Sequence, residues 1–165
     1  MHNAVHLYGG FFQLGYVVRD LDQAVAAYQK RFGDTEFLLF TPPELPDGTQ
    51  PPTKRIALAY IDDLMIELIE INAEDPGIFG HALPRDTDTM VLHHLGFRVS
   101  DHTTTLEHLE RTGLKLDWVG QAPGMLGYIY ADARAETGLY LEFIHTLPAG
   151  DAFFAAVPRN RSKAA

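Results

Sequence analysis

The sequence contains no cysteine and only one tryptophan, and its basic residues are few. The absence of cysteine excludes a disulfide framework and a thiolate metal site. The 13 lysines and arginines are outnumbered by 22 aspartates and glutamates, which gives a formal net charge of −9 at pH 7. A chain without a basic stripe cannot release counterions from a phosphate backbone, so we expect no nucleic-acid partner.

Long apolar runs are also missing. No run approaches the roughly 18 residues that cross a bilayer, and the segment MHNAVHLYGG lacks the basic and then apolar pattern of a signal peptide. We therefore expect no membrane partner, and together with the absence of cysteine this favours the cytoplasm. A length of 165 residues fits one domain, in which two half-size modules share a core.

One pattern of residues occurs almost twice. Residues 13–33 read QLGYVVRDLDQAVAAYQKRFG, and residues 94–113 read HLGFRVSDHTTTLEHLERTG. Each copy runs from a polar residue through Leu, Gly, an aromatic residue, Val and Asp into a helical pattern that ends on Gly. A second echo follows each copy, as MIELIE around Glu67 and YLEFIH around Glu142. Because repeats decide the architecture, the pattern predicts two related modules.

Apolar spacing and turn residues predict the same order of elements in both modules, namely strand, helix and three strands. The proline-rich segment 41–53 is expected to be a loop, because proline cannot donate to a strand ladder. This gives an α+β fold with a curved mixed sheet around a central metal cavity and a pseudo-twofold relation between the modules. We place one domain at residues 1–148, with module one at about 11–72, a linker at 73–90, module two at about 91–145, and a C-terminal helix and frayed tail at 149–165.

Four polar side chains occupy equivalent positions on the first and last expected strands of the two modules: Gln13, Glu67, His94 and Glu142. Alternation along a strand gives each of them apolar neighbours on its own face. A lone carboxylate on such a face is costly to desolvate unless it is paired or binds a metal. Two carboxylates, an imidazole and an amide oxygen would together neutralise a divalent cation and leave positions open.

The residues alone leave simpler alternatives open. A single glutamate on a strand usually faces solvent, and a glutamine can form hydrogen bonds at a sheet edge. His93 points to the face opposite His94, and we interpret it as a buried or capping histidine. Alternation also cannot show that the four strands converge.

The strand-helix-three-strand plan, opened by QLGYVV and HLGFRV and closed by IELIE and LEFIH, resembles the vicinal oxygen chelate superfamily over residues 11–144. That superfamily includes glyoxalase I, methylmalonyl-CoA epimerase, extradiol dioxygenases and the fosfomycin and bleomycin resistance proteins. The resemblance implies paired βαβββ units with metal ligands on their first and last strands, which here are Gln13, Glu67, His94 and Glu142. It also implies a homodimer. The ligand set is most similar to glyoxalase I, whereas the text HHLGFRVSD is similar to the epimerase branch.

The resemblance implies a divalent-metal-dependent isomerase, epimerase or lyase of glyoxalase type that acts on a small carbonyl compound. A cation that holds two substrate oxygens stabilises an enediolate, so the neighbouring C–H proton becomes removable. Glu142 is the expected base, with Glu67 as its partner. The metal is expected to be one ion of Zn, Ni, Co, Mn or Fe(II), with no organic cofactor.

Candidate substrate contacts are Arg98, which shares a face with His94, and Tyr140. Aromatic residues near the strands, among them Trp118 and Tyr128, are candidates to line a pocket for a hydrophobic or aromatic substrate. Two other functions stay open. A metal-dependent ring-cleaving dioxygenase is one, although dioxygenases carry a histidine where Gln13 stands. A metal-free small-molecule binding protein of the resistance type is the other.

Overall fold

The computed structural model describes residue 6, residues 8–45 and residues 47–162. The chain divides into two compact units, one made of Leu14–His93 with Ala156–Ala165, the other of Met1–Gln13 with His94–Ala155. We call them the 14–93 unit and the 94–155 unit. The boundaries fall within two strands, β1 (Phe11–Val18) and β5 (Met90–Arg98). No helix in the described ranges is long and apolar enough to cross a membrane.

The 14–93 unit contains most of β1, followed by α1 (Leu21–Phe32), β2 (Leu38–Phe40), β3 (Thr53–Ile61) and β4 (Leu64–Ile71). The strands lie in the order β2-β3-β4-β1, and the 3₁₀ helix η1 (Gly77–Ala82) follows. The β3–β4 hairpin turns at Asp62, whose φ of 53° is one that aspartate tolerates better than most residues. The hairpin supplies two of the three strands expected after the first helix.

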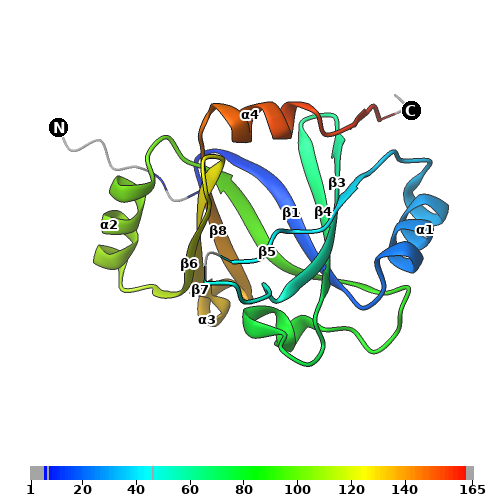
Figure 1. Ribbon diagram of the computed structural model, residues 1–165, viewed down its shortest axis with the longest axis horizontal. Coiled ribbons are helices and arrows are strands. Elements are labelled where there is room, and N and C mark those ends of the chain that lie inside the picture. Colours follow the sequence, from blue (N-terminus) through cyan, green and yellow to red (C-terminus); the bar gives the residue numbers. More distant parts are fainter. Residues whose placement is uncertain (1–5, 7, 46, 163–165) are drawn as a thin grey trace. The chain divides into compact units, whose positions relative to one another are not determined.

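Local sequence sets both ends of α1. The side chain of Asp20 accepts a hydrogen bond from the Gln23 amide at 3.0 Å, which satisfies one of the unpaired donors of the first turn. Gly33 ends the helix with a φ of 118°, a value that a side chain would strain. Helix α1 packs on β3 and β4 (Figure 1). Its buried residues Leu21 and Ala24 belong to the apolar cluster of this unit.

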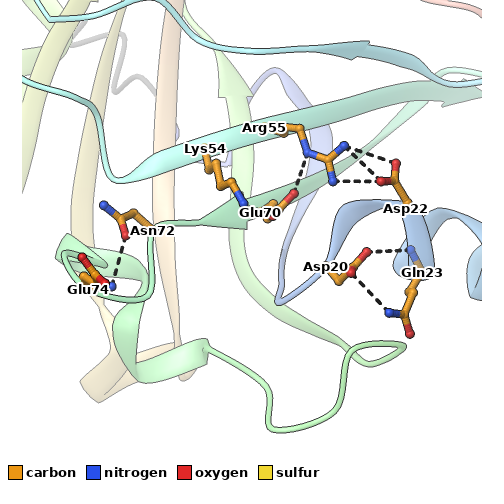
Figure 2. A network of polar contacts seen from close by, with 8 residues as sticks. All are labelled: Asp20, Asp22, Gln23, Lys54, Arg55, Glu70, Asn72 and Glu74. Carbon is orange, nitrogen blue, oxygen red and sulfur yellow. Dashed lines mark hydrogen bonds and ion pairs between the residues drawn. The ribbon is translucent and has the colours of Figure 1, made fainter.

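A charged network fastens α1 to this sheet (Figure 2). Arg55 on β3 donates to Glu70 of β4 at 2.7 Å and, through the far side of its guanidinium, to Asp22 of α1 at 3.1 Å. Lys54 donates to the other oxygen of Glu70 at 2.9 Å. The Glu70 side chain is only 7% exposed, so these two cations compensate the cost of burying its charge.

The C-terminal segment forms β9 (Arg159–Asn160), which runs parallel to β3 in the 14–93 unit. The Asn160 side chain donates to the Tyr60 carbonyl at 3.1 Å and accepts from the Glu36 amide at 2.9 Å. Ser162 contacts the Asp62 carboxylate. Residues 160–162, which were expected to belong to a frayed tail, are therefore held to β3 and to the turn at Asp62 by specific hydrogen bonds, and the rest of that tail lies outside the described residues.

The 94–155 unit contains the C-terminal part of β5, then α2 (His102–Thr112), β6 (Lys115–Ala122), β7 (Leu126–Ala133), α3 (Arg134–Thr137), β8 (Leu139–Thr146) and α4 (Pro148–Ala155). Its strands lie in the order β5-β8-β7-β6, with β5 and β8 parallel and the other pairs antiparallel. Asp101 caps α2 by accepting from the Thr104 amide at 2.6 Å, and Gly113 ends it at a φ of 77°.

One face of this sheet packs under α2 and forms the core of the unit. Leu109 of α2 lies against an apolar cluster built from alternate residues of the strands, which includes Phe97, Ile129, Leu141 and Phe143. The opposite face carries the polar and aromatic residues of the candidate site. The α+β class and the βαβββ order of each module are confirmed, whereas α3, β9 and η1 were not predicted.

Candidate metal centre

His94 and Glu142 come together because β5 and β8 run side by side. The parallel register pairs His94 with Tyr140 and Gly96 with Glu142, so His94 and Glu142 lie diagonally on the same face. His94 Nε2 is 3.2 Å from Glu142 Oε2, and the two side chains are 0% and 8% exposed. An imidazole and a carboxylate are thus held almost completely out of water.

Gln13 ends the N-terminal segment of this unit, and its side chain lies against Gly96 of β5. A Cβ built on Gly96 would come within 2.3 Å of Gln13 Oε1 and 2.7 Å of Gln13 Cβ. The Gln13 side chain therefore occupies the space that a side chain at position 96 would take. Gly96 is the residue that pairs with Glu142. Gln13 is 1% exposed. The 94–155 unit brings together three of the four expected ligands.

Two oxygens of this group are buried and receive no hydrogen bond from the described part of the chain. Among the described residues none donates a hydrogen bond to Gln13 Oε1 or Glu142 Oε2. A buried acceptor left in this state costs roughly 1–3 kcal/mol. The 3.2 Å approach of Glu142 Oε2 to His94 Nε2 meets the distance of an ion pair but not the direction of a hydrogen bond.

A divalent cation fits this arrangement. Two ligands at about 2.1 Å from one ion, at angles between octahedral and tetrahedral, lie about 3.0–3.4 Å apart. The distance between His94 Nε2 and Glu142 Oε2 falls within that interval. An imidazole nitrogen with carboxylate and amide oxygens suits a first-row divalent ion, and the open set is unlike a closed structural zinc site.

Glu67, the fourth expected ligand, belongs to the 14–93 unit. It lies on β4, where it pairs with Leu58 of β3, and it is 9% exposed. A carboxylate this deeply buried needs compensation by a partner or a cation. Glu67 thus has the burial expected of a ligand, while the group formed by Gln13, His94 and Glu142 belongs to the other unit.

The two expected substrate contacts, Tyr140 and Arg98, are engaged with neighbours. Tyr140 is 2% exposed and donates to Asp117 Oδ2 at 2.7 Å. Burial and this carboxylate raise the pKa of Tyr140. The Arg98 guanidinium lies between the rings of Phe12 and Phe154, 4.6 Å from each centroid. Both side chains carry contacts that position them within the 94–155 unit.

Other residues near the site were not identified from the sequence. The ring of Tyr130 contacts that of His94 edge to face at 5.3 Å and thereby fixes the plane of the imidazole. Tyr130 faces Glu142 across β7 and β8. Gly96 is the second residue that sequence reasoning did not identify, and its lack of a side chain leaves room for Gln13. The glycine was visible in the motif, but its role depends on a close approach that only the fold reveals.

His93 was expected to be buried, and this is confirmed, since it is 0% exposed. In the 14–93 unit its Nε2 lies 3.2 Å from the Ile78 carbonyl, and its ring packs on that of Phe79 at 4.7 Å. His81 on η1 lies near the same carbonyl, with its Nδ1 at 3.1 Å.

A separate hollow of about 410 Å³ in the 94–155 unit is lined by the β6–β7 hairpin, His102 and His145. His94 and Glu142 do not line it.

Comparisons with known proteins agree with this fold. Residues 12–131 match the family described as the Glyoxalase/Bleomycin resistance protein/Dioxygenase superfamily. This match covers more than half of the chain. The chain therefore belongs to that superfamily, whose fold the βαβββ modules display. The search of curated protein sequences gave no match.

Solved structures with the same fold include epimerases. Methylmalonyl-CoA epimerase from Mycobacterium tuberculosis is 20% identical, with a TM-score of 0.62 over 87% of this chain and 91% of that one. A variant of the Streptomyces coelicolor epimerase, in complex with 2-nitronate-propionyl-CoA, is 18% identical, with a TM-score of 0.63 over 86% and 96%. A hypothetical protein from Bacillus halodurans C-125 is 18% identical, with a TM-score of 0.58 over 82% and 92%.

Proposed function

We propose that the protein is a divalent-metal-dependent isomerase or epimerase that acts on a small carbonyl compound. Gln13, Glu67, His94 and Glu142 would hold one cation, and each of the last three is buried and offers a ligand atom of a suitable kind. The observation that carries the proposal is the buried approach of Glu142 Oε2 to His94 Nε2 at 3.2 Å, with Gln13 Oε1 as a second acceptor that lacks a donor. The epimerases among the solved structures support the class of reaction.

The cation would supply Lewis acidity toward the oxygens of the carbonyl substrate. The residues of the chain would supply the orientation of the ligands and the base that moves the proton. His94 is held by the edge of Tyr130 and keeps its plane. Burial excludes water from Glu142, so its carboxylate is not solvated and can accept a proton from the carbon next to the carbonyl. Return of the proton to the neighbouring carbon gives isomerisation, and return to the opposite face of the same carbon gives epimerisation.

Metal content tests the binding half of the proposal. Wild-type protein purified without chelator or affinity nickel is expected to contain about one divalent ion per chain by plasma mass spectrometry, and Glu142→Ala is expected to lose it. Glu136→Ala is the matched control, because Glu136 is an exposed glutamate in the same unit. Absence of metal from wild-type protein after reconstitution would refute the proposal.

Proton transfer tests the catalytic half. Metal-loaded protein is incubated in deuterium oxide with methylmalonyl-CoA or with the hemithioacetal of methylglyoxal and glutathione. Deuterium incorporation next to the carbonyl is followed by mass spectrometry. Glu142→Gln is expected to keep the fold and abolish exchange. Exchange at the wild-type rate in this variant would remove Glu142 from the role of base.

A further inference from the structure

Three aromatic residues share the sheet face of His94 and Glu142 in the 94–155 unit. Tyr130 pairs with Glu142 across β7 and β8, and Trp118 of β6 pairs with Tyr130. Tyr128 lies two residues before Tyr130 and so points to the same side. Directly opposed residues of antiparallel strands project to one face, which places the three rings in a continuous row beside the candidate metal ligands.

The rings are packed against one another in a defined way. Trp118 stacks on Tyr130 with centroids 5.7 Å apart and an interplanar angle of 16°. Tyr128 stands edge-on to Trp118 at 5.0 Å and 75°. Such pairs are rigid and present both a flat surface and a ring edge to a ligand. We call Trp118, Tyr128 and Tyr130 the aromatic wall.

The wall depends on a glycine. A Cβ built on Gly120 would lie 2.4 Å from both Cζ and the hydroxyl oxygen of Tyr128. The Tyr128 ring therefore lies across β6 in the space that a side chain would fill. Burial, and secondarily the charge of Glu142, raise the pKa of Tyr128 to about 12.

Burial differs along the wall in a manner that ordinary core packing does not explain. Tyr130 is 5% exposed, whereas Trp118 and Tyr128 are only half-buried on the face that carries Glu142. The core of this unit lies on the other face, under α2. Two large rings that pack on each other and are yet partly exposed on the sheet face of Glu142 are suited to bind a flat group.

We propose that the aromatic wall binds the substrate's planar apolar group, so that the preferred substrates are carbonyl compounds with an aromatic ring. Trp118 and Tyr128 stack on that ring, and the Tyr128 hydroxyl donates a hydrogen bond to a substrate oxygen. This deepens the proposed function and rests on it for the chemistry, but stacking itself does not require the cation.

The test compares two ligands that present the same pair of neighbouring oxygens, phenylglyoxylate and pyruvate. Trp118 is the only tryptophan of the chain, so its fluorescence reports directly on the wall. Phenylglyoxylate is expected to quench it and to bind about 10-fold tighter than pyruvate, since one or two stacking contacts contribute roughly this factor. Equal affinities, or no binding of phenylglyoxylate at millimolar concentration, would overturn the inference.

Variants separate the ring from the hydroxyl. Tyr128→Leu removes the ring and the hydroxyl together, so calorimetry is expected to show weaker binding of both ligands, with phenylglyoxylate losing about 3- to 10-fold more affinity than pyruvate. Tyr128→Phe removes only the hydroxyl and is expected to weaken both ligands equally. Val119→Ala is the control, because Val119 is an exposed neighbour with its side chain on the other face. An undiminished preference for phenylglyoxylate in Tyr128→Leu would refute the role of the wall.

Metal content, measured on the same samples, separates this inference from the proposed function. A preference for phenylglyoxylate that Tyr128→Leu abolishes supports the wall whether or not a cation is bound. One cation per chain with no such preference supports the metal site and overturns the wall. The wild-type fluorescence comparison decides the matter even where a variant fails to fold.

Discussion

Replacing Gly96 with alanine perturbs the candidate metal centre through a single methyl group. The new Cβ would lie 2.3 Å from Gln13 Oε1, while ordinary contact begins near 3.4 Å, so the amide must retreat by about 1 Å. Metal ligands tolerate deviations of about 0.2 Å, so a cation held by Gln13 as proposed would lose this oxygen. We expect metal affinity to fall at least about 10- to 100-fold, which is the range seen when even supporting contacts of ligands are lost.

The same substitution also overpacks a filled interior, which costs roughly 1–3 kcal/mol of folding stability. Affinity is measured by competition with a chromophoric chelator, and stability by urea unfolding of the metal-free protein. Gly120→Ala is the matched control. Its Cβ would come within 2.4 Å of Tyr128, so it produces a similar clash against a residue that is not a ligand. It is expected to lose comparable stability and to keep its metal.

Two results would refute the reasoning. Metal binding by Gly96→Ala as tight as that of the wild type would show that Gln13 is not a ligand. Equal losses of affinity in Gly96→Ala and Gly120→Ala would show that general destabilisation, and not displacement of the Gln13 amide, weakens the site. The difference between the two affinities is therefore the informative quantity.

Three further predictions concern charge and titration. Arg55→Leu leaves the buried Glu70 short of one cation and is expected to cost about 1–3 kcal/mol in urea unfolding; no loss would show that this ion pair contributes nothing. Hydrogen bonds from Arg134 hold the pKa of Asp132 at about 2, below its unfolded value, so its stabilisation is present above about pH 4 and lost as the pH falls toward 2. Asp132→Asn should remove that dependence and cost about 1 kcal/mol at pH 7, less than the full shift implies because the Arg134 side chain is 38% exposed; an unchanged acid profile would contradict this. Burial and a nearby carboxylate raise the pKa of Tyr128 to about 12, so stability from its neutral form is present below about pH 10 and lost as the pH rises toward 12; a tyrosinate absorbance difference between wild type and Tyr128→Phe that appears near pH 10 would be the contrary result.

Elements whose signals are local were predictable from the sequence. Asp20 and Gly33 mark the ends of α1, because a capping carboxylate and a residue with positive φ act over a few residues of chain. The alternation around His94 likewise indicated which face it occupies. By contrast, β9 depends on hydrogen bonds of Asn160 with Glu36 and Tyr60, which are far away in the sequence. No local pattern announces such a contact.

The candidate site was predictable only in part, for a similar reason. The residue types and their mirrored positions indicated Gln13, His94 and Glu142, yet their convergence depends on the parallel register of β5 and β8. That register pairs Gly96 with Glu142 and lets Gln13 lie over the glycine. A shift by one residue would turn Glu142 toward the core under α2.

A bulge in β6 explains why alternation fails at the aromatic wall. Strict alternation would put Leu116 and Trp118 on one face, but the register shifts between them, with Leu116 paired to Ala131 and Trp118 to Tyr130. Leu116 consequently packs into the core under α2, and Trp118 turns toward the face of Glu142.

The residue released by the bulge is Asp117, which accepts the hydrogen bond from Tyr140 at 2.7 Å. The inserted residue thus has two effects. It places Trp118 in the aromatic wall, and through Asp117 it holds Tyr140, which pairs with His94 across β5 and β8. Because both effects come from the same bulge, removing the inserted residue is expected to disturb both the aromatic wall and the position of Tyr140 beside His94. Bulges are frequent beside functional sites, where they redirect side chains, and this one redirects Trp118 and Asp117.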